Sequence, residues 1–141
     1  MISRDCIRFN LLKPGQDYFA VEDQVRKIFA DSIQIATDPN NPHPTDKVFI
    51  DATHLSPAAR TSVRRNIKGR PYLIAVSVEV PLEVALERNA KRTGRAFVPE
   101  TAIRNMYNRY EIPTLKEGFD EVWHIDANGR LIWKEIREYN I

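Results

Sequence analysis

Residues 72–90 read YLIAVSVEVPLEVALERNA, and this stretch decides the fold that we predict. Residues 72–80 are rich in β-branched side chains and have the length of a strand. Pro81 follows directly and suits the first turn of a helix with apolar residues at helical spacing. A strand followed at once by such a helix is the repeating unit of α/β folds with a largely parallel sheet.

The same alternation continues on both sides of this stretch. We expect a single α/β domain over residues 1–141, a three-layer αβα sandwich around a largely parallel sheet. Residues 38–46, DPNNPHPTD, form the one obvious loop, since three prolines and two asparagines forbid regular structure there. The other elements that we predict are a helix ending at Leu12, helices over 18–37 and 57–68, a short strand over 48–51, a helix opened by Pro99, a strand over 122–126, and a two-residue hairpin turn at Asn128-Gly129.

Composition excludes several classes of protein. The net charge is only +2, with 21 Lys and Arg against 19 Asp and Glu, so no strong general affinity for nucleic acid or acidic membranes is expected. The longest apolar stretch is too short to cross a bilayer, and residues 1–9 lack the apolar run of a signal peptide. The single cysteine, Cys6, is expected to be a small buried hydrophobe. We therefore expect a cytoplasmic protein without a membrane partner.

Asp5 and Arg8 form the first group of candidate site residues. They are three positions apart, so a helix that follows residues 1–3 places them on one face. Ligands of open parallel sheets bind beyond the carboxyl ends of the strands, where this helix would begin. A carboxylate there can accept a proton from a hydroxyl while the guanidinium holds a phosphate. The alternative is a first-turn Asp that favours the helix dipole and a solvated Arg.

Residues 48–55, VFIDATHL, place Asp51 at the tip of the short predicted strand. A carboxylate in that position can lie beside a magnesium ion or a substrate hydroxyl in nucleotide-processing sheets. An Asp after a strand is also common in turns, where its side chain bonds to nearby backbone groups, so both interpretations stay open. We interpret His54 as a hydrogen-bonding structural residue.

Arg88, Arg92 and Arg95 lie in LERNAKRTGRAFVP, residues 86–99. Arg88 and Arg92 are expected on one helix face, where like charges repel unless an anion sits between them. Thr93-Gly94 can act as a hinge for the segment that carries Arg95. A mobile basic segment suits phosphoryl transfer, because the negative charge on the transferring phosphoryl group must be neutralised as it moves. The alternative is a solvated basic helix end.

Residues 113–120 are expected to form a connecting loop, and we assign no catalytic or binding role to them.

Taken together and in order, four segments resemble the P-loop kinase family that includes the polynucleotide kinases. They are ISRDCIRF, VFIDATHL, VPLEVALERNAKRTGRAFVP and YEIPTLKEGFDEVWHID, and they span residues 2–126. Each segment alone is unspecific, so the resemblance rests on their order and separation.

The resemblance implies an acceptor site. Asp5 stands where the family has its general base for the 5′-hydroxyl of a nucleic acid, and Arg8 where an arginine grips an acceptor phosphate. Asp51 stands at the acidic strand tip that helps to place the acceptor, and Thr53 is implied beside it. His54 stands where an asparagine is also common, so that position matches only loosely. The implied partner is a nucleic-acid acceptor.

The resemblance also implies a donor site and a lid over residues 88 to 112. Arg88, Arg92 and Arg95 match arginines that bind the donor, and Arg92 is implied as catalytic because it would stabilise the donor phosphates. The implied cofactors are ATP and Mg²⁺, with no metal ligand assigned to this chain.

One part of the family pattern is missing. The family begins with a strand, a phosphate-binding loop G-x-x-x-x-G-K-[ST] and a helix, whereas no glycine of this chain is followed by lysine. In the family fold the missing strand lies between the strands that match residues 48–51 and 72–80. Its removal would leave unpaired backbone groups, and apolar side chains where the core should be, so something must fill the gap. Either the chain is a fragment, or another chain supplies the strand, or the remaining strands have repacked.

The expected function is ATP-dependent phosphoryl transfer to a hydroxyl, with the 5′-hydroxyl of a nucleic acid as the leading acceptor and no activity from the chain alone. A small-molecule kinase on the same scaffold is an alternative that the near-neutral charge favours slightly. A non-catalytic module that binds nucleotides or anions at a degenerate site is the other.

Overall fold

A computed structural model describes residues 1–139 of the chain, except for the side chain of Arg95. The chain is mixed α/β and divides into two compact units. Unit 1 comprises Met1–His54 and Ala58–Pro71, and unit 2 comprises Leu55–Pro57 and Tyr72–Ile141. The α/β character agrees with the sequence, whereas the single three-layer sandwich stays a prediction.

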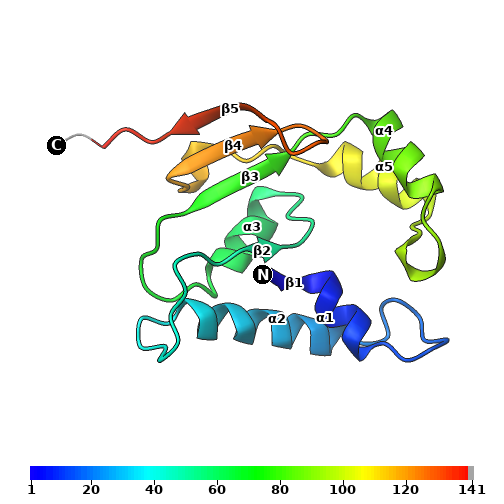
Figure 1. Ribbon diagram of the computed structural model, residues 1–141, viewed down its shortest axis with the longest axis horizontal. Helices are drawn as coiled ribbons and strands as arrows, with labels where there is room; N and C mark the ends of the chain where they lie inside the picture. Colours follow the sequence, from blue (N-terminus) through cyan, green and yellow to red (C-terminus); the bar gives the residue numbers. More distant parts are fainter. Residues whose placement is uncertain (140–141) are drawn as a thin grey trace. The chain divides into compact units, whose positions relative to one another are not determined.

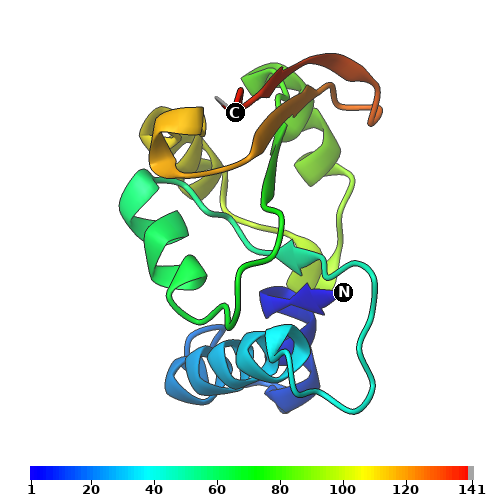
Figure 2. The same cartoon turned by 90° about the vertical axis from the view of Figure 1, so that its left-hand side faces the viewer.

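Unit 1 is built on two helices and a minimal parallel sheet. Its first two strands pair in parallel, with Ile2 opposite Ile50 and Ser3 opposite Asp51. Figure 1 shows the first two helices side by side, and Figure 2 shows the wide connection that leads from the second helix to the second strand. The elements are β1 (Ile2–Ser3), α1 (Arg4–Leu11), α2 (Glu22–Thr37), β2 (Ile50–Asp51) and α3 (Pro57–Arg64), whose first residue belongs to unit 2.

Local signals place the ends of α1. Ser3 is its N-cap, and the Ser3 hydroxyl accepts a hydrogen bond from the Cys6 backbone N–H at 3.3 Å. The helix stops before Pro14, as the sequence predicted. Cys6 is exposed, so the expectation of a buried cysteine was wrong. Helical position decided this, because Cys6 faces away from the buried side on which Arg8 lies.

Helix α2 begins four residues later than the sequence predicted. The Asp17 carboxylate accepts a hydrogen bond from Phe19 N–H at 3.4 Å, and the Asp17 carbonyl accepts one from Ala20 N–H at 3.0 Å. Aspartate competes for backbone groups in this way at turns, and it delays the helix here.

The core of unit 1 is one face of α2. Val25, Phe29 and Ile33 are buried at four-residue intervals, and Leu12 and Val21 join them. Ile35, on the opposite face of the helix, is 66% exposed. The amphipathic spacing that predicted this helix is therefore also what orients it.

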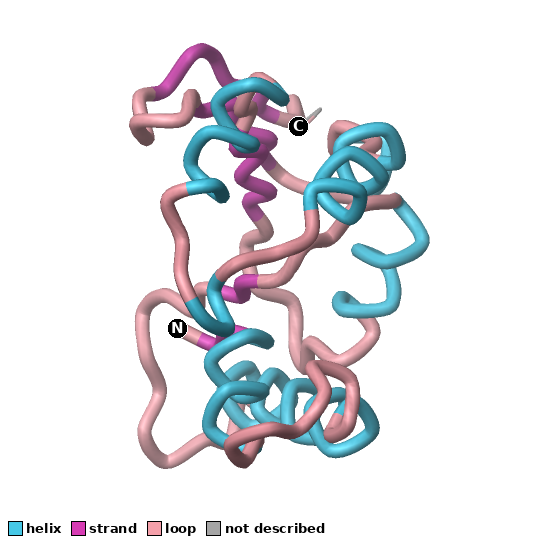
Figure 3. The backbone as a smooth tube through the Cα atoms, turned by 90° about the vertical axis from the view of Figure 1, so that its right-hand side faces the viewer, coloured by secondary structure: helices cyan, strands magenta, loops and turns pink. Residues whose placement is uncertain are grey.

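Unit 2 is a three-stranded sheet with helices packed against it. The strand order is β3-β4-β5, with β3 and β4 parallel and β4 and β5 antiparallel, as the arrows of Figure 1 show. Figure 3 shows the contrast between these strands and the very short ones of unit 1. The elements are β3 (Ile74–Val78), α4 (Leu82–Ala90), the 3₁₀ turn η1 (Gly94–Ala96), α5 (Glu100–Arg109), the 3₁₀ turn η2 (Leu115–Glu117), β4 (Glu121–Ile125) and β5 (Leu131–Ile136).

Pro81 and Pro99 precede α4 and α5 directly, which confirms the helix starts that these prolines predicted. The hairpin between β4 and β5 is also confirmed, but its two-residue turn was wrong. Asp126 N–H donates to the Arg130 carbonyl at 2.8 Å, so residues 127–129 form the connection. Gly129 has φ +80° there, which suits the glycine of a three-residue hairpin loop.

Both sheets have strands with a neighbour on one side only. Among the described residues, β2 pairs with β1 in the sheet of unit 1, and β3 pairs with β4 in the sheet of unit 2.

The α2 core generates a stability prediction. Ile33→Ala should lower the free energy of unfolding by about 2 to 5 kcal/mol, because Ile33 is fully buried and its truncation leaves a cavity. Ile35→Ala, on the exposed face, should change it by less than about 0.5 kcal/mol. Urea unfolding of the wild type and both variants measures the difference. Equal effects of the two substitutions would contradict the orientation of α2.

Candidate functional site

Asp5 lies in the first turn of α1, beyond the carboxyl end of β1. Its side chain is 64% exposed, and its Oδ1 accepts a hydrogen bond from the Tyr18 hydroxyl at 2.8 Å. Burial and this hydrogen bond raise the pKa of Tyr18, so the phenol stays protonated and can donate. Asp5 is therefore an oriented carboxylate that remains open to solvent.

Arg8 is buried rather than solvated. Its Nη1 donates to Glu22 Oε2 at 2.5 Å and to the Tyr18 carbonyl at 3.2 Å, and its guanidinium lies 4.2 Å from the centre of the Tyr18 ring. Its Nε is buried and has no hydrogen-bond partner among residues 1–139. The solvated alternative for Arg8 was therefore wrong, while the grip on an acceptor phosphate stays a prediction.

Glu22 is the residue on which this cluster depends, and the sequence analysis missed it. Its two oxygens accept hydrogen bonds from Arg8 and from Arg4 Nη2, each at 2.5 Å. The hydrogen bond from Arg8 lowers the pKa of Glu22, against the opposing effect of burial. Glu22 looked like an ordinary acidic residue near a helix start, and nothing in its spacing linked it to α1.

Asp51 lies at the end of β2, directly opposite Ser3. The Ser3 hydroxyl donates to Asp51 Oδ2 at 3.3 Å while it accepts the capping bond at the start of α1. One hydroxyl thus joins the exposed strand-tip carboxylate to the helix that carries Asp5 and Arg8. The structure brings these three predicted residues together in unit 1, and Thr53 is exposed just beyond Asp51.

His54 follows in a left-handed conformation, with φ +46°. Its carbonyl accepts a hydrogen bond from Arg60 Nη1 at 2.7 Å, and Arg60 is only 5% exposed. Burial lowers the pKa of His54, which favours its neutral form. These contacts suit the structural role that the sequence suggested.

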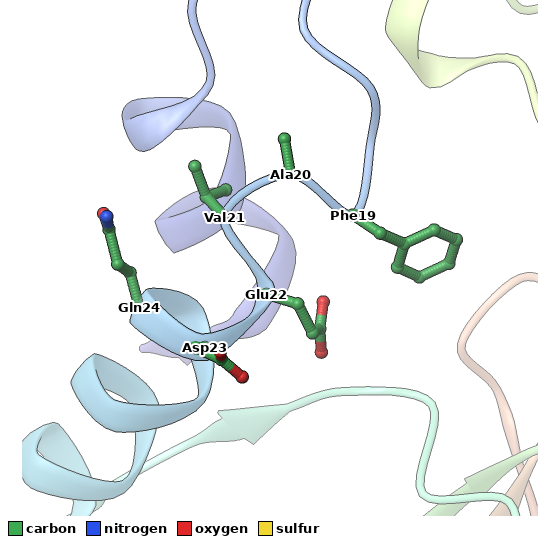
Figure 4. A pocket seen from close by; sticks show the side chains of 6 residues that line it. All are labelled: Phe19, Ala20, Val21, Glu22, Asp23 and Gln24. Carbon is green, nitrogen blue, oxygen red and sulfur yellow. The ribbon is translucent and has the colours of Figure 1, made fainter.

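A pocket of about 250 Å³ lies at the start of α2 and is lined by residues 19–24. In Figure 4 the Phe19 ring and the Glu22 carboxylate extend to one side of the chain, and Gln24 extends to the other. Two of the lining side chains, Glu22 and Asp23, are acidic. None of the six lining residues is a Lys, Arg or His, so the lining itself offers no cationic side chain to a phosphate group.

The predicted donor-binding arginines belong to unit 2. Helix α4 ends at Ala90, so Arg92 lies beyond it and the predicted shared helix face with Arg88 was wrong. Arg88 is exposed, and its Nη1 donates to the Ala127 carbonyl at 3.0 Å. Arg92 is exposed, and Arg95 lies in η1.

Asn89, near the end of α4, anchors the segment that follows the helix, and this role was not predicted. It is 4% exposed, its Nδ2 donates to the Val98 carbonyl at 2.6 Å, and its Oδ1 accepts from Val98 N–H at 3.0 Å. The amide therefore closes the segment that carries Arg92 and Arg95 into a loop, and the hinge expected at Thr93-Gly94, within this loop, stays a prediction.

A second polar cluster lies within the sheet of unit 2. His124 is 3% exposed, its Nδ1 lies 2.6 Å from Glu79 Oε1, and its ring stacks on Trp133 at 4.2 Å. Ser77, opposite His124 on β3, shares a 2.5 Å hydrogen bond with the Tyr110 hydroxyl at the end of α5. These contacts tie α5 and the hairpin to β3. The sequence analysis assigned none of them.

The fit of the implied cofactors can be judged from these residues. Ser3 and Asp51 offer a hydroxyl and a carboxylate, which suit Mg²⁺ only when a nucleotide supplies phosphate ligands. Among residues 1–139 no group of three or more His, Cys, Asp or Glu side chains could hold a metal ion. The glycines with positive φ lie in turns and do not precede lysine, so they make no phosphate cradle. These residues alone therefore do not fit ATP.

Comparison with family models, with curated proteins and with solved structures gave no match to this chain. Within the described part of the chain, no helix combines the length and the apolar character that crossing a membrane requires.

The Glu22 cluster generates a pH-dependent prediction. Because the pKa of Glu22 is lowered by folding, its ion pair stabilises the protein above the unfolded pKa of about 4.3, and this contribution is lost as the pH falls through the folded pKa. Glu22→Gln should therefore cost about 1.5 to 3 kcal/mol at pH 7, because it weakens a hydrogen bond between charged groups and leaves Arg8 buried without its counter-charge. The difference from wild type should shrink as the pH falls below about 4.

Denaturant unfolding at pH 7 and pH 3 measures this difference. Asp31→Asn is the matched control, since it removes an exposed i, i+4 pair with Lys27 and should cost less than about 0.5 kcal/mol. A Glu22→Gln effect as small as that of the control would show that the cluster does not stabilise unit 1.

Proposed function

We propose that unit 1 carries the acceptor site of a phosphotransferase that uses ATP to phosphorylate a hydroxyl group, with the 5′-hydroxyl of a nucleic acid as the leading acceptor. The observation that carries the proposal is the position of Asp5. An exposed, oriented carboxylate stands in the first turn of α1, beyond the end of β1, and the Ser3 hydroxyl that caps this helix also donates a hydrogen bond to Asp51. Substrates bind at this edge of a parallel sheet.

Asp5 is the general base in this proposal. The Tyr18 hydroxyl holds one carboxylate oxygen, which restricts how the group can rotate. A carboxylate held in this way can accept the proton of an acceptor hydroxyl as the oxygen attacks. Asp51 is the partner that fixes the acceptor, through a hydrogen bond to a second hydroxyl.

The contacts of Arg8 refine its role. Since Nη1 is bound by Glu22 and by the Tyr18 carbonyl, an acceptor phosphate would have to engage another part of the guanidinium. Arg8 also links α1 to the start of α2. In this proposal Arg8 is therefore first a positioning residue, and it contacts the phosphate only through a donor atom that the cluster leaves free.

The donor half of the reaction needs groups that residues 1–141 do not provide. Arg88, Arg92 and Arg95 would neutralise charge on the transferring phosphoryl group, as lid arginines do. The backbone cradle and lysine that hold the β- and γ-phosphates must come from elsewhere. We therefore expect no turnover from the 141-residue chain by itself.

A small-molecule kinase is the second candidate. The net charge of +2 favours it, because a protein that grips a nucleic-acid backbone gains affinity from a stronger basic surface. Phosphorylation of a 5′-hydroxyl oligonucleotide, compared with that of nucleosides and sugars, separates the two. A third candidate is a non-catalytic module that binds anions. Such a module would need Arg8, Arg88 and Arg92 for binding, but it would not need Asp5 as a base.

The role of Asp5 predicts a loss of turnover. In a version of the chain supplied with a phosphate-binding strand and loop, Asp5→Asn should lower kcat by about 10² to 10³, because an amide cannot accept the proton. The fold should be retained, since asparagine can still accept the Tyr18 hydrogen bond. Steady-state kinetics with a 5′-hydroxyl oligonucleotide measures the effect. Full turnover by Asp5→Asn would exclude general-base catalysis by this residue.

The role of Arg92 predicts a different kinetic pattern. In the same version, Arg92→Ala should lower kcat or raise the KM for ATP by at least about tenfold, while the KM for the acceptor stays within about twofold. Arg104→Ala is a matched control, because Arg104 is an exposed arginine engaged with Glu100 on α5. If Arg92→Ala and Arg104→Ala behave alike, Arg92 has no role in donor binding.

A further inference from the structure

The small net charge of the chain conceals one strongly basic segment. Residues 52–78 carry five Lys and Arg and no Asp or Glu, whereas the other 16 Lys and Arg share the rest of the chain with all 19 Asp and Glu. The five basic residues begin in α3 and continue past its end at Arg64, within unit 1. They are Arg60, Arg64, Arg65, Lys68 and Arg70. The segment is therefore basic in a chain that is acidic elsewhere.

The structure divides these five residues into two groups. Arg60 is buried and Arg64 is half-buried, and both side chains have partners in the fold. Arg65, Lys68 and Arg70 are exposed, and within residues 1–139 none of their side chains takes part in an ion pair. Three exposed cations without a counter-charge therefore lie within the turn at residues 65–70, which we call the basic turn.

The backbone of the basic turn is fixed to the end of α2. Asn66 Oδ1 accepts a hydrogen bond from a glutamine side chain of α2 at 3.3 Å, and the Lys68 backbone N–H donates to Thr37 Oγ1 at 2.9 Å. Gly69 has φ +76°, and a side chain there would meet the Pro39 ring at 3.0 Å. These contacts order the backbone of the turn in advance, which lowers the entropy cost of binding a ligand there.

The carboxyl ends of two helices account for only part of this charge. Each helix end carries about half an elementary negative charge, which favours cations in its last turn. The ends of α2 and α3 together therefore offset about one of the three cations. The remaining positive charges repel each other, and a bound anion would relieve this repulsion.

We infer that the basic turn binds the phosphate backbone of a nucleic-acid strand. A chain of regularly spaced phosphates is complementary to several cations at once, and an arginine can bind phosphate oxygens through two parallel N–H donors. Stable attachment to a membrane needs an apolar anchor besides basic residues, whereas the exposed residues of α3 are small or polar. These residues are Pro57, Ala58, Ala59 and Ser62. The observations therefore favour a nucleic acid over a lipid surface.

The basic turn is separate from the proposed acceptor site. Glu22, at the start of α2, belongs to the cluster around Asp5, whereas Thr37, at the end of the same helix, contacts the basic turn. A helix rises 1.5 Å per residue, so these two ends lie about 22 Å apart along α2. The inference therefore goes beyond the proposed function, and it holds whether or not the chain takes part in phosphoryl transfer.

Fluorescence anisotropy with a single-stranded DNA of about 20 nucleotides tests the inference on the 141-residue chain. The dye is attached to the 5′ end, so the DNA offers no acceptor hydroxyl. The wild type should bind, with an affinity that falls as salt rises. The triple variant Arg65→Gln/Lys68→Gln/Arg70→Gln should bind at least about tenfold more weakly at about 50 mM salt. Its salt slope should be smaller by about 2, since each phosphate contact on a single strand contributes about 0.7.

A charge-matched variant is the control. Lys13→Gln/Arg26→Gln/Lys47→Gln removes three exposed cations that are spread through unit 1, so its net charge equals that of the first variant. It should bind the DNA within about twofold of the wild type, because salt screens charges that lie far from the strand. Equal losses in the two variants would show that net charge governs binding, and they would overturn the inference.

Chemical protection of the wild type gives a second measurement, which does not depend on how a variant folds. Saturating DNA should protect the Lys68 amine from acetylation and leave Lys13 and Lys47 reactive, as measured by mass spectrometry of the modified peptides. Absence of salt-dependent binding, or equal protection of the three lysines, would contradict the inference. Polyglutamate or anionic phospholipid vesicles that bind as tightly as the DNA would overturn it in favour of an acidic protein or a membrane. None of these results depends on phosphoryl transfer.

Discussion

Strand pairing is the constraint on which this structure depends. Every backbone N–H and C=O group needs a partner, and a strand in the interior of a sheet finds partners on both sides. Here β1 and β2 pair with each other over only two residue pairs. β3 pairs with β4, which provides hydrogen-bond partners along one edge of β3. Burial follows the same limit, because a strand with one neighbour leaves its side chains half covered. This limit agrees with the exposure of Ile74, Val76 and Val78 on β3, which are 40%, 50% and 53% exposed.

The elements that the sequence predicted well are those set by local signals. Pro81 and Pro99 open helices, Ser3 caps one, and the four-residue spacing on α2 identifies its buried face. Boundaries were less accurate where a side chain competes for backbone groups. Asp17 delays α2, and α4 ends at Ala90, beyond which the Asn89 side chain holds Val98. Each of these details depends on a single side chain. The hydrophobic periodicity used to predict a helix is read over many residues, so it does not locate the end of the helix to one residue.

The candidate site was predictable in its residue types and much less in its contacts. Asp5 and Asp51 could be placed from their positions after strands, because strand ends meet at one edge of a parallel sheet. The hydrogen bond between Ser3 and Asp51 joins residues 48 positions apart, and Glu22, the partner of Arg8, lies 14 positions from it. No spacing rule connects residues that far apart. Arg8 was therefore assigned to solvent or ligand, whereas an internal carboxylate holds it in the folded chain.

The two hydrogen bonds between the Asn89 side chain and the Val98 backbone bear on how much the sequence between these residues can change in length. One amide side chain fixes both ends of the basic loop, and it does so inside unit 2. The residues between these two anchor points contribute little to the packing of α4 or α5. Loop closure depends only weakly on length, so insertions or deletions there would leave the helices in place. The loop can therefore change its length and its number of arginines while the scaffold that presents it stays the same.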